Sequence, residues 1–269
     1  MSENIVTAEE ISGGFQFLEG PVWVPAHNEL LFSDIPASKI YRYKDGKFDA
    51  FRHPSGQANG NTLDPEGRLV TCEHENRRVS RTDRDGSVVD LATHFQGKRL
   101  NSPNDVVCRS EGSVYFSDPP YGVKPEDREL DFQGVFRLSP DGKTLTVIAR
   151  DFVKPNGLAF SPDENLLYIA DTELGHIRAF DVNPDGTIAN GRVFCTVERP
   201  DGFRVDIEGS LYISAMKAVE IFDRTGKKIG EIELAERPAN VAFGDADRRT
   251  LYICARTGLY RIRVNVPGR

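Results

Sequence analysis

An internal repeat of about 40 residues restricts the fold of this chain more than any other feature. The clearest copy, PNGLAFSPDENLLYIADTELGHIRAFDV, starts at Pro155 and reads as a turn, an apolar strand, a second turn, a second strand, a loop and a third strand. Related units begin near Gly20, Gly60, Pro103, Pro155, Pro200 and Pro238, at spacings of 40, 43, 52, 45 and 38 residues. Repeats of this length with about four strands each are typical of a β-propeller rather than of a helical solenoid.

The residues between the repeated strands support an all-β fold. Short turn sequences such as PEG, SEG, SPDG and NPDG separate the alternating runs, and their glycines accommodate positive φ angles. No long segment has a 3.6-residue period, so we expect very little helix. The sequence therefore predicts one all-β domain over residues 1–269, a six-bladed β-propeller, with an open sandwich of similar strands as the alternative.

The two ends of the chain complement each other in this interpretation. The last unit ends in GLYRIRVNVPGR, which leaves room for only three strands. Residues before Gly20 belong to no unit, so we expect them to supply the missing outer strand of the last blade. Pairing the two ends in this way closes the ring and leaves no sheet edge exposed there.

Composition and charge argue against several classes of function. Lys and Arg total 34 against 41 Asp and Glu, which gives a formal net charge of −7. The sequence contains no block of basic residues, which argues against nucleic-acid binding. A run of about 18 apolar residues, which would predict a membrane helix, is absent from the sequence. The N-terminal sequence MSENIVTAEEISGG lacks the basic and apolar regions of a signal peptide, so we expect a cytoplasmic protein. No oligomeric state is predicted.

One position at the start of the units carries a polar residue in five of the six copies. In the aligned units this position holds Glu19, Asn59, Asn104, Asn156, Asp201 and Ala239. The first strand of each blade lines the central channel, so we expect these side chains to meet at one end of it. Asn and Asp taken singly are common turn residues, but Glu is not, and five polar residues in register favour a shared site.

The oxygen-rich character of this ring predicts a bound divalent cation. Carboxylate and amide oxygens are the ligands that Ca²⁺, Mg²⁺ and Mn²⁺ prefer in proteins. Glu19 and Asp201 supply two negative charges that balance such an ion. Calcium is the expected ion, with Mg²⁺, Mn²⁺ or Zn²⁺ as alternatives. The expected ligands are Glu19, Asn104, Asn156 and Asp201.

Several separate motifs together resemble one known family. They are FLEGPVW, NGNTLDPEGRLVTCEH, GKRLNSPNDVV followed by YFSDPPYG, PNGLAFSPDE and PDGFRVD. On these motifs the chain resembles the SMP-30/gluconolactonase/LRE-like family from about Glu19 to about Ile253, and is most similar to its bacterial gluconolactonases. The resemblance implies a six-bladed propeller with one catalytic calcium. It also implies metal ligands at Glu19, Asn156 and Asp201, and a contact to the metal or the substrate at Asn104.

The expected chemistry is metal-assisted hydrolysis of a lactone ester. A cation beside the lactone carbonyl acts as a Lewis acid and stabilises the charge that develops when water attacks. We assign Asp201 as the general base that deprotonates this water. A serine triad is not indicated, because the sequence has no GxSxG motif and its five His residues have no evident Ser partner.

The residues expected to bind the substrate lie at the same end of the channel. They are Asn59, His74, Arg99, Asn104 and Tyr121. Tyr121 belongs to the longest insertion, residues 119–133, which is expected at the channel mouth as a lid, with a merely longer surface loop as the alternative. Asp34, Asp118 and Asp171 end second strands and are interpreted as residues that cap backbone groups.

Three functions agree with these features. The first is hydrolysis of a sugar lactone such as glucono-1,5-lactone. The second is a related hydrolase acting on phosphotriesters or another lactone, and the third is a non-catalytic propeller scaffold with structural calcium. A scaffold does not need acidic side chains at the channel mouth, so Glu19 and Asp201 favour catalysis.

Overall fold

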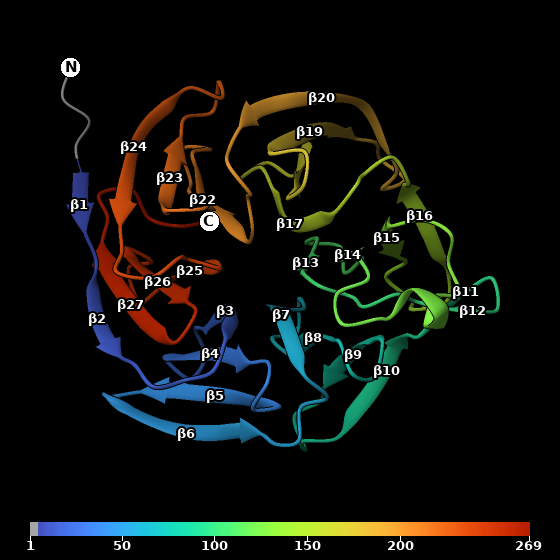
Figure 1. Cartoon of the computed structure of the whole chain (residues 1–269), viewed down its shortest axis with the longest axis horizontal. Helices are drawn as coiled ribbons and strands as arrows, with labels where there is room; N and C mark the ends of the chain where they lie inside the picture. Colours follow the sequence, from blue (N-terminus) through green and yellow to red (C-terminus); the bar gives the residue numbers. More distant parts are fainter. Residues whose placement is uncertain (1–4) are drawn as a thin grey trace.

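The computed structural model describes residues 5–269 and shows six β-sheets arranged as blades around a central channel (Figure 1). This arrangement confirms the predicted six-bladed β-propeller. The first strand of each blade lies at the channel, and the following strands lie progressively further out. The starts of six inner strands are thereby brought to one end of a common channel.

The first three blades each contain four antiparallel strands. Blade 1 consists of β3 (Leu18–Val24), β4 (Glu29–Asp34), β5 (Lys39–Lys44) and β6 (Lys47–Arg52). Blade 2 consists of β7 (Ala58–Leu63), β8 (Leu69–Glu73), β9 (Arg78–Thr82) and β10 (Val88–Ala92). Blade 3 consists of β13 (Val106–Cys108), β14 (Val114–Asp118), β15 (Gly134–Leu138) and β16 (Leu145–Ala149).

The remaining blades follow the same plan, except that the last one lacks a fourth strand of its own. Blade 4 consists of β17 (Pro155–Phe160), β18 (Leu166–Asp171), β19 (His176–Val182) and β20 (Ile188–Thr196). Blade 5 consists of β21 (Phe203–Val205), β22 (Leu211–Ser214), β23 (Ala218–Phe222) and β24 (Lys228–Glu233). Blade 6 consists of β25 (Asn240–Gly244), β26 (Thr250–Ala255) and β27 (Gly258–Arg263).

The N-terminal residues complete blade 6, as predicted. Strand β2 (Glu9–Ser12) pairs antiparallel with β27 and places Glu10 opposite Tyr260. A further strand, β1 (Ile5–Thr7), was not predicted, and it pairs in parallel with β24 at the outer edge of blade 5. The N-terminal segment therefore joins two blades, and its second strand closes the ring.

Apolar side chains fill the spaces between neighbouring sheets. Trp23 of β3 stacks on Tyr252 of β26 with ring centroids 5.8 Å apart, inside a buried cluster between blades 1 and 6. In blade 3, Phe116 stacks on Phe136 at 5.3 Å. Burying each large apolar side chain stabilises the fold by about 1.5–3 kcal/mol. This packing fixes the blades and, with them, the strand ends that converge on the channel.

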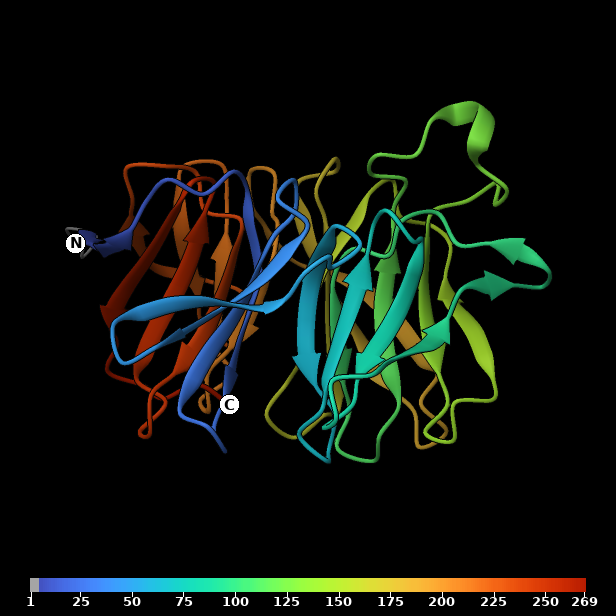
Figure 2. The same cartoon turned by 90° about the horizontal axis from the view of Figure 1, so that it is seen from below.

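Two segments extend beyond the blades. A short hairpin, β11 (His94–Phe95) and β12 (Lys98–Arg99), projects between blades 2 and 3. The insertion after β14 contains one turn of 3₁₀ helix, Pro125–Asp127, and Figure 2 shows it rising above one end of the ring. Within residues 5–269, no helix has the length and apolar character needed to cross a membrane.

Candidate functional site

The polar residues at the starts of the units converge at one end of the channel. Glu19, Asn59 and Asn156 lie near the beginning of the inner strands β3, β7 and β17. Asn104 and Asp201 lie just before β13 and β21. All five are largely buried, and the side chain of Asp201 keeps 16 % of its surface exposed. We call these five residues the polar ring.

Irregular strand pairing turns ring side chains toward the channel. The pairing of β3 with β4 shifts register between Glu19 and Val22. The pairing of β17 with β18 shifts between Pro155 and Leu158, on either side of Asn156. A β-bulge re-aims side chains in this way and occurs frequently beside functional sites.

Glycine follows the ring residue in four of the six units. These glycines are Gly20, Gly60, Gly157 and Gly202. No side chain fits there, because a Cβ atom on Gly157 would lie 2.4 Å from the carbonyl oxygen of Asp201. A Cβ atom on Gly202 would lie 2.0 Å from Cγ of Asn240. The inner strands can therefore approach closely enough for ring side chains to contact one another.

The three asparagines of the polar ring form a continuous chain of hydrogen bonds. Nδ2 of Asn59 donates to Oδ1 of Asn104 at 2.7 Å, and Nδ2 of Asn104 donates to Oδ1 of Asn156 at 2.8 Å. Nδ2 of Asn156 in turn donates to Oγ1 of Thr172 at 3.0 Å. Nδ2 of Asn59 also lies 3.0 Å from Nε2 of His74. Burial lowers the pKa of His74 to about 4, so the ring is neutral at pH 7 and Nε2 accepts this bond.

Three carboxyl groups share this end of the channel: the predicted Glu19 and Asp201, and Asp105, which the sequence analysis missed. Burial raises the pKa of Glu19 well above its usual value, and the negative charges of Asp201 and Asp105 raise it further. Burial also raises the pKa of Asp105 and of Asp201. The positive charges of Arg204, 3.8 Å from Asp105, and of Arg237, 3.6 Å from Asp201, oppose this effect.

Asn240 connects two of these carboxyl groups and was also missed. Its Nδ2 donates to Oε2 of Glu19 at 3.0 Å and lies 3.5 Å from Oδ2 of Asp105. The aligned position of the sixth unit holds Ala239, so the alignment does not include Asn240, the residue that follows it. Asp105 and Asn240 stand where the other four units carry glycine, and this departure from the pattern is the signal that identifies them.

The donor set at this end of the channel fits a hard divalent cation. Among residues 5–269, no three His, Cys, Asp or Glu side chains meet closely enough to hold a metal by themselves, so a cation bound here would need amide oxygens as further ligands. Oδ1 of Asn59 is buried and has no hydrogen-bond partner among the described residues. A cation beside Glu19 and Asp201 would also neutralise the like charges that raise the pKa of Glu19.

A cavity of about 670 Å³, which we call the upper cavity, opens beside the polar ring. Its wall includes His74, Arg99 and Tyr121, three of the residues predicted to bind the substrate. The hydroxyl of Tyr121 lies 3.4 Å from Nδ2 of Asn156, and its ring stacks on that of His74 with centroids 6.3 Å apart. Several residues of the insertion 119–133 line the same cavity, so the insertion lies at the channel mouth.

Two arginines attach this insertion to the rest of the molecule. Nη1 of Arg77 donates to the backbone oxygen of Asp127 at 3.0 Å, and the backbone N–H of Arg99 donates to the carboxylate of Glu129 at 2.8 Å. The second terminal nitrogen of Arg77 is buried and has no hydrogen-bond partner in the part of the chain that the structure describes. Arg77 lies in the turn before β9, and the repeat pattern of the sequence does not single it out.

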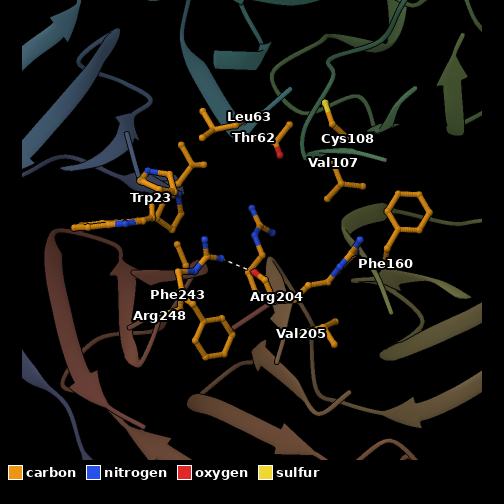
Figure 3. A pocket seen from close by; sticks show the side chains of 16 residues that line it. Trp23, Thr62, Leu63, Val107, Cys108, Phe160, Arg204, Val205, Phe243 and Arg248 are labelled. Atoms are coloured by element: carbon orange, nitrogen blue, oxygen red, sulfur yellow. Dashed lines mark hydrogen bonds between the residues drawn. The ribbon is translucent and has the colours of Figure 1, made fainter. Parts of the chain in front are cut away.

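Beyond the polar ring the channel continues as a second cavity of about 300 Å³, which we call the lower cavity (Figure 3). Most of its wall comes from the later residues of the same inner strands, and Arg248 and Arg269 from outside these strands complete it. Apolar side chains such as Trp23 and Phe243 share this wall with arginines. The side chain of Arg204 reaches into this cavity, and its Nη1 lies 3.8 Å from Oδ2 of Asp105. Arg204 therefore lies between the two ends of the channel.

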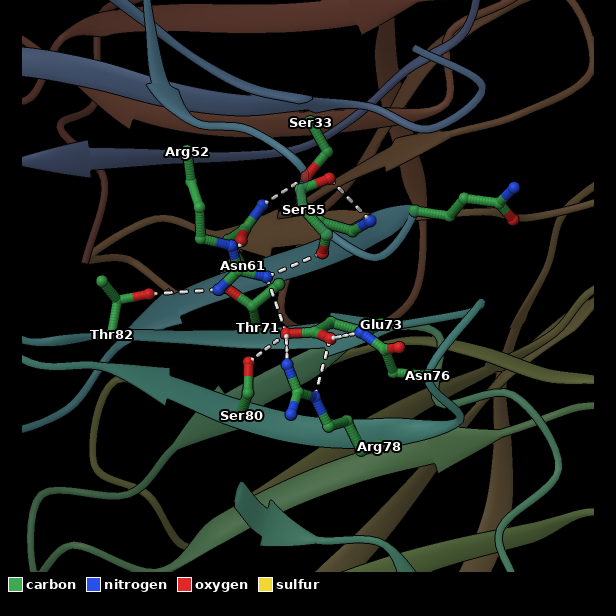
Figure 4. A network of polar contacts seen from close by, with 12 residues as sticks. Ser33, Arg52, Ser55, Asn61, Thr71, Glu73, Asn76, Arg78, Ser80 and Thr82 are labelled. Carbon is green, nitrogen blue, oxygen red and sulfur yellow. Dashed lines mark hydrogen bonds and ion pairs between the residues drawn. The ribbon is translucent and has the colours of Figure 1, made fainter. Parts of the chain in front are cut away.

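A separate polar network joins blade 1 to blade 2 (Figure 4). Glu73, at the end of β8, is fully buried and accepts hydrogen bonds from Arg52 and Arg78, each at 2.7 Å. Burial alone would raise the pKa of Glu73, but the hydrogen bonds from Arg78 and the charge of Arg52 outweigh it, and this pKa lies below its usual value. The network fixes the end of the strand that leads directly into His74.

Asp34, Asp118 and Asp171 cap backbone groups, as the sequence analysis expected. Asp118 accepts hydrogen bonds from the backbone N–H groups of Asn101 and Ser102, both at 2.8 Å. These bonds hold the segment that presents Asn104 to the channel. In the same way, the carboxylate of Asp34 accepts hydrogen bonds from the backbone N–H groups of Gln16 and Phe17. The carboxylate of Asp171 accepts them from the backbone N–H groups of Val153 and Lys154.

Comparisons with known proteins agree with this architecture. A family profile described as the SMP-30/Gluconolactonase/LRE-like region matches residues 17–257. The chain is 34 % identical to a gluconolactonase of Zymomonas mobilis, over 97 % of this chain and 82 % of that protein. It is 30 % identical to a pentonolactonase of Haloferax volcanii, over 89 % and 81 % of the two chains. A solved structure of a gluconolactonase from Xanthomonas campestris matches with a TM-score of 0.89 at 36 % identity, covering 97 % of this chain and 89 % of that one.

Proposed function

Because the chain belongs to the SMP-30/gluconolactonase/LRE-like family, we propose that it is a metal-dependent hydrolase that opens the ester ring of a sugar lactone. Relatives named gluconolactonase and pentonolactonase support a lactone as the substrate. The observation that carries the proposal is the meeting of Glu19, Asn156 and Asp201 at one end of the channel, beside the upper cavity.

The polar ring is the proposed cation site, and calcium is the proposed ion. Mg²⁺, Mn²⁺ and Zn²⁺ are the alternatives. The hydrogen bonds between the ring amides hold their oxygens in fixed directions, which lowers the cost of ordering them around an ion. The chemistry that a bound divalent cation supplies here is polarisation of the lactone carbonyl. The proposed ligands are Glu19, Asn104, Asn156 and Asp201.

Asp201 is the proposed general base. Its side chain is 16 % exposed, against 2 % for Asp105, so a water molecule beside the substrate has access to it. Asp201 removes a proton from this water while the water oxygen bonds to the carbonyl carbon. The bond between that carbon and the ring oxygen then breaks, and the proton passes to the departing oxygen. The product is an open-chain hydroxy acid.

Side chains that line the upper cavity, together with Asn59 and Asn104 of the polar ring, which do not line it, are proposed to hold the sugar hydroxyls. Oδ1 of Asn59 is an unused acceptor, and the hydroxyl of Tyr121 lies at the boundary between the cavity and the polar ring. The insertion 119–133 is proposed to act as a lid that excludes water from the bound lactone. The full set of proposed substrate-binding residues is Asn59, His74, Arg99, Asn104 and Tyr121.

A pH-indicator assay over a panel of sugar lactones, with and without EDTA, tests this function. We expect hydrolysis of at least one sugar lactone, loss of that activity in EDTA, and recovery when calcium is added back. A phosphotriester in the same panel tests the related hydrolase, and turnover of that compound alone would replace the lactone assignment. Absent or EDTA-insensitive hydrolysis across the panel would contradict the proposal and favour a non-catalytic scaffold.

A further inference from the structure

The residue directly after the second strand has a side-chain hydrogen-bond acceptor in only two of the six units. Nε2 of His74 lies 3.0 Å from Nδ2 of Asn59, the ring asparagine of the same unit. Oγ1 of Thr172 accepts a hydrogen bond from Nδ2 of Asn156, again the ring asparagine of its own unit, at 3.0 Å. His74 and Thr172 therefore lie at the two ends of the chain of ring amides. The residues at this position are Ile35, His74, Pro119, Thr172, Ala215 and Arg256.

The hydroxyl of Thr172 has a single hydrogen, and the structure shows where this hydrogen goes. Oγ1 of Thr172 donates to the backbone oxygen of Pro200 at 2.7 Å. A carbonyl oxygen only accepts, and no backbone N–H among residues 5–269 donates to this one. Because its hydrogen is used on Pro200, the hydroxyl of Thr172 can only accept from the side chain of Asn156.

This hydroxyl determines which way round the ring amides lie. The oxygen and nitrogen of an Asn side chain have nearly the same size, so hydrogen bonds rather than packing distinguish them. Because Nδ2 of Asn156 faces Thr172, its Oδ1 faces Asn104 and accepts from that residue's Nδ2 at 2.8 Å. Oδ1 of Asn104 in turn accepts from Nδ2 of Asn59 at 2.7 Å. Reversing any one of these amides would place two oxygens or two N–H groups against each other.

Thr172 also holds the peptide group that precedes the side chain of Asp201. The carbonyl oxygen of this peptide, on Pro200, accepts from Thr172, and its N–H, on Asp201, donates to the backbone oxygen of Ser214 at 2.9 Å. Thr172 is only 3 % exposed, so bulk water does not compete for its hydrogen bonds. One buried hydroxyl therefore connects Asn156 of blade 4 with the segment of blade 5 that carries Asp201.

We propose that Thr172 is a positioning residue for the cation site, because its hydroxyl sets the direction in which the ring amides present their oxygens. This role rests on the proposed function of the polar ring. An amide oxygen is a ligand for a hard divalent cation, whereas an amide NH₂ group turned toward the ion is not. Hydrogen bonds that orient the ligands of a metal typically contribute about 10- to 100-fold to its affinity.

Calorimetric titration of the metal-free full chain with calcium tests this role. Thr172→Val keeps the shape of the side chain but removes the hydroxyl, and it should weaken calcium binding about tenfold. Thr172→Ser keeps the hydroxyl and should bind calcium with the affinity of the unmodified chain. Thr146→Val makes the same change at an exposed position of the outer strand β16 and should leave the affinity unchanged. If Thr172→Val does not fold, Thr172→Ala takes its place, because it also removes the hydroxyl.

A second measurement needs neither metal nor substrate. Nitrogen NMR of the metal-free chain shows which ring nitrogen of His74 carries the proton, with the signals assigned from His74→Gln. The amide direction set by Thr172 makes Asn59 the donor to Nε2 of His74, so the proton should lie on Nδ1 in the unmodified chain. Thr172→Val releases the amides, and a second population with the proton on Nε2 should appear.

Three results would overturn the role of Thr172 and leave the proposed function standing. These are an unchanged calcium affinity in Thr172→Val, an equal loss of affinity in Thr172→Ser, and a proton on Nε2 of His74 in the unmodified chain. An equal loss in Thr172→Ser would show that the methyl group, rather than the hydroxyl, is what the site needs. An unmodified chain that has the expected His74 tautomer but binds no calcium would instead contradict the proposed function, and this role with it.

Discussion

Glu19 and Asp201 share the same end of the channel but differ in how firmly they are held. Glu19 is buried and accepts hydrogen bonds from the backbone N–H of Gly20 at 2.8 Å and from Asn240 at 3.0 Å. Asp201 is partly exposed and has Arg237 as a neighbour at 3.6 Å. The fixed carboxylate is suited to holding an ion, whereas the accessible one can also exchange a proton with water.

Replacing Asp201 tests the assignment of the base. Asp201→Asn keeps the shape and one oxygen ligand but removes the proton acceptor, so kcat for lactone hydrolysis should fall about 100- to 10,000-fold. The measurement is made at saturating calcium, with calcium binding determined in parallel. Glu208→Gln, at an exposed position in the same blade, is the control and should keep full activity. A near-normal kcat in Asp201→Asn would rule out Asp201 as the base.

Glu73 shows how a buried charge joins two blades. In Glu73→Gln, Arg52 loses its counter-charge. The Arg52 side chain is only 10 % exposed, so water cannot replace that counter-charge. Urea unfolding at pH 7 should show a loss of about 3 kcal/mol in the free energy of unfolding. Asp90→Asn removes the exposed partner of Arg78 and should change stability by less than about 0.5 kcal/mol. Equal losses in the two variants would contradict this account of the network.

The same carboxylate predicts a pH dependence of stability. The pKa of Glu73 in the folded protein lies below its value in the unfolded chain, which is about 4.3. Its contribution is therefore complete above that unfolded value and is lost as the pH falls through the folded one. The difference in unfolding free energy between the unmodified chain and Glu73→Gln should stay constant from about pH 8 to 6 and shrink below about pH 4. A difference that grows in acid would contradict this sign.

Among the strands, close approach at the polar ring depends on glycine. Gly157→Ala places a Cβ atom 2.4 Å from the carbonyl oxygen of Asp201, so the inner strands of blades 4 and 5 have to separate. We expect a loss of about 1–3 kcal/mol in urea unfolding, together with weaker calcium binding. Gly230→Ala, in the outer strand β24, meets nothing closer than Ile221 at 3.9 Å and serves as the control. Equal stability of the two variants would show that the strands have room to move.

The repeat pattern predicts elements that belong to a unit and misses those that do not. The inner strands, the polar ring and the closing strand β2 follow from the alignment of the units. Strand β1 and the hairpin β11–β12 lie outside it, and the partner of β1 is more than 200 residues away along the chain. Asp105 and Asn240 occupy the position directly after the aligned one, where the other four units have glycine. An alignment that compares only the ring position does not include them. The hydrogen bond from Asn240 to Glu19 and the effect of the Asp105 charge on Glu19 depend on the close approach of strands, which the sequence does not specify.

For the molecule as a whole, ring closure rests on the N-terminal segment. Deleting residues 1–12 removes both β1 and β2 and leaves the edge of β27 unpaired, so the melting temperature should fall by about 10 °C. Deleting residues 1–7 removes only the outer strand of blade 5 and should lower it by less than about 3 °C. Differential scanning calorimetry of the two truncated chains measures the difference. Equal melting temperatures for both would contradict a closing role for β2.

The channel combines two chemically different ends in one molecule. Carboxyl and amide groups gather at the mouth beneath the insertion 119–133, and guanidinium groups gather in the lower cavity. The ion pair between Asp105 and Arg204 lies where the two ends meet. One ring of six inner strands therefore gathers carboxyl and amide groups at one end and arginine side chains at the other.

A crystal soaked in manganese and measured by anomalous scattering tests the proposed cation site directly. The account predicts one strong anomalous peak on the channel axis, about 2.0–2.6 Å from side-chain oxygens of Glu19, Asn156 and Asp201. Manganese also binds oxygen ligands, so it stands in for calcium in this measurement. The absence of a peak between these three residues, or a peak bound only elsewhere, would contradict the proposal that the polar ring is a metal site.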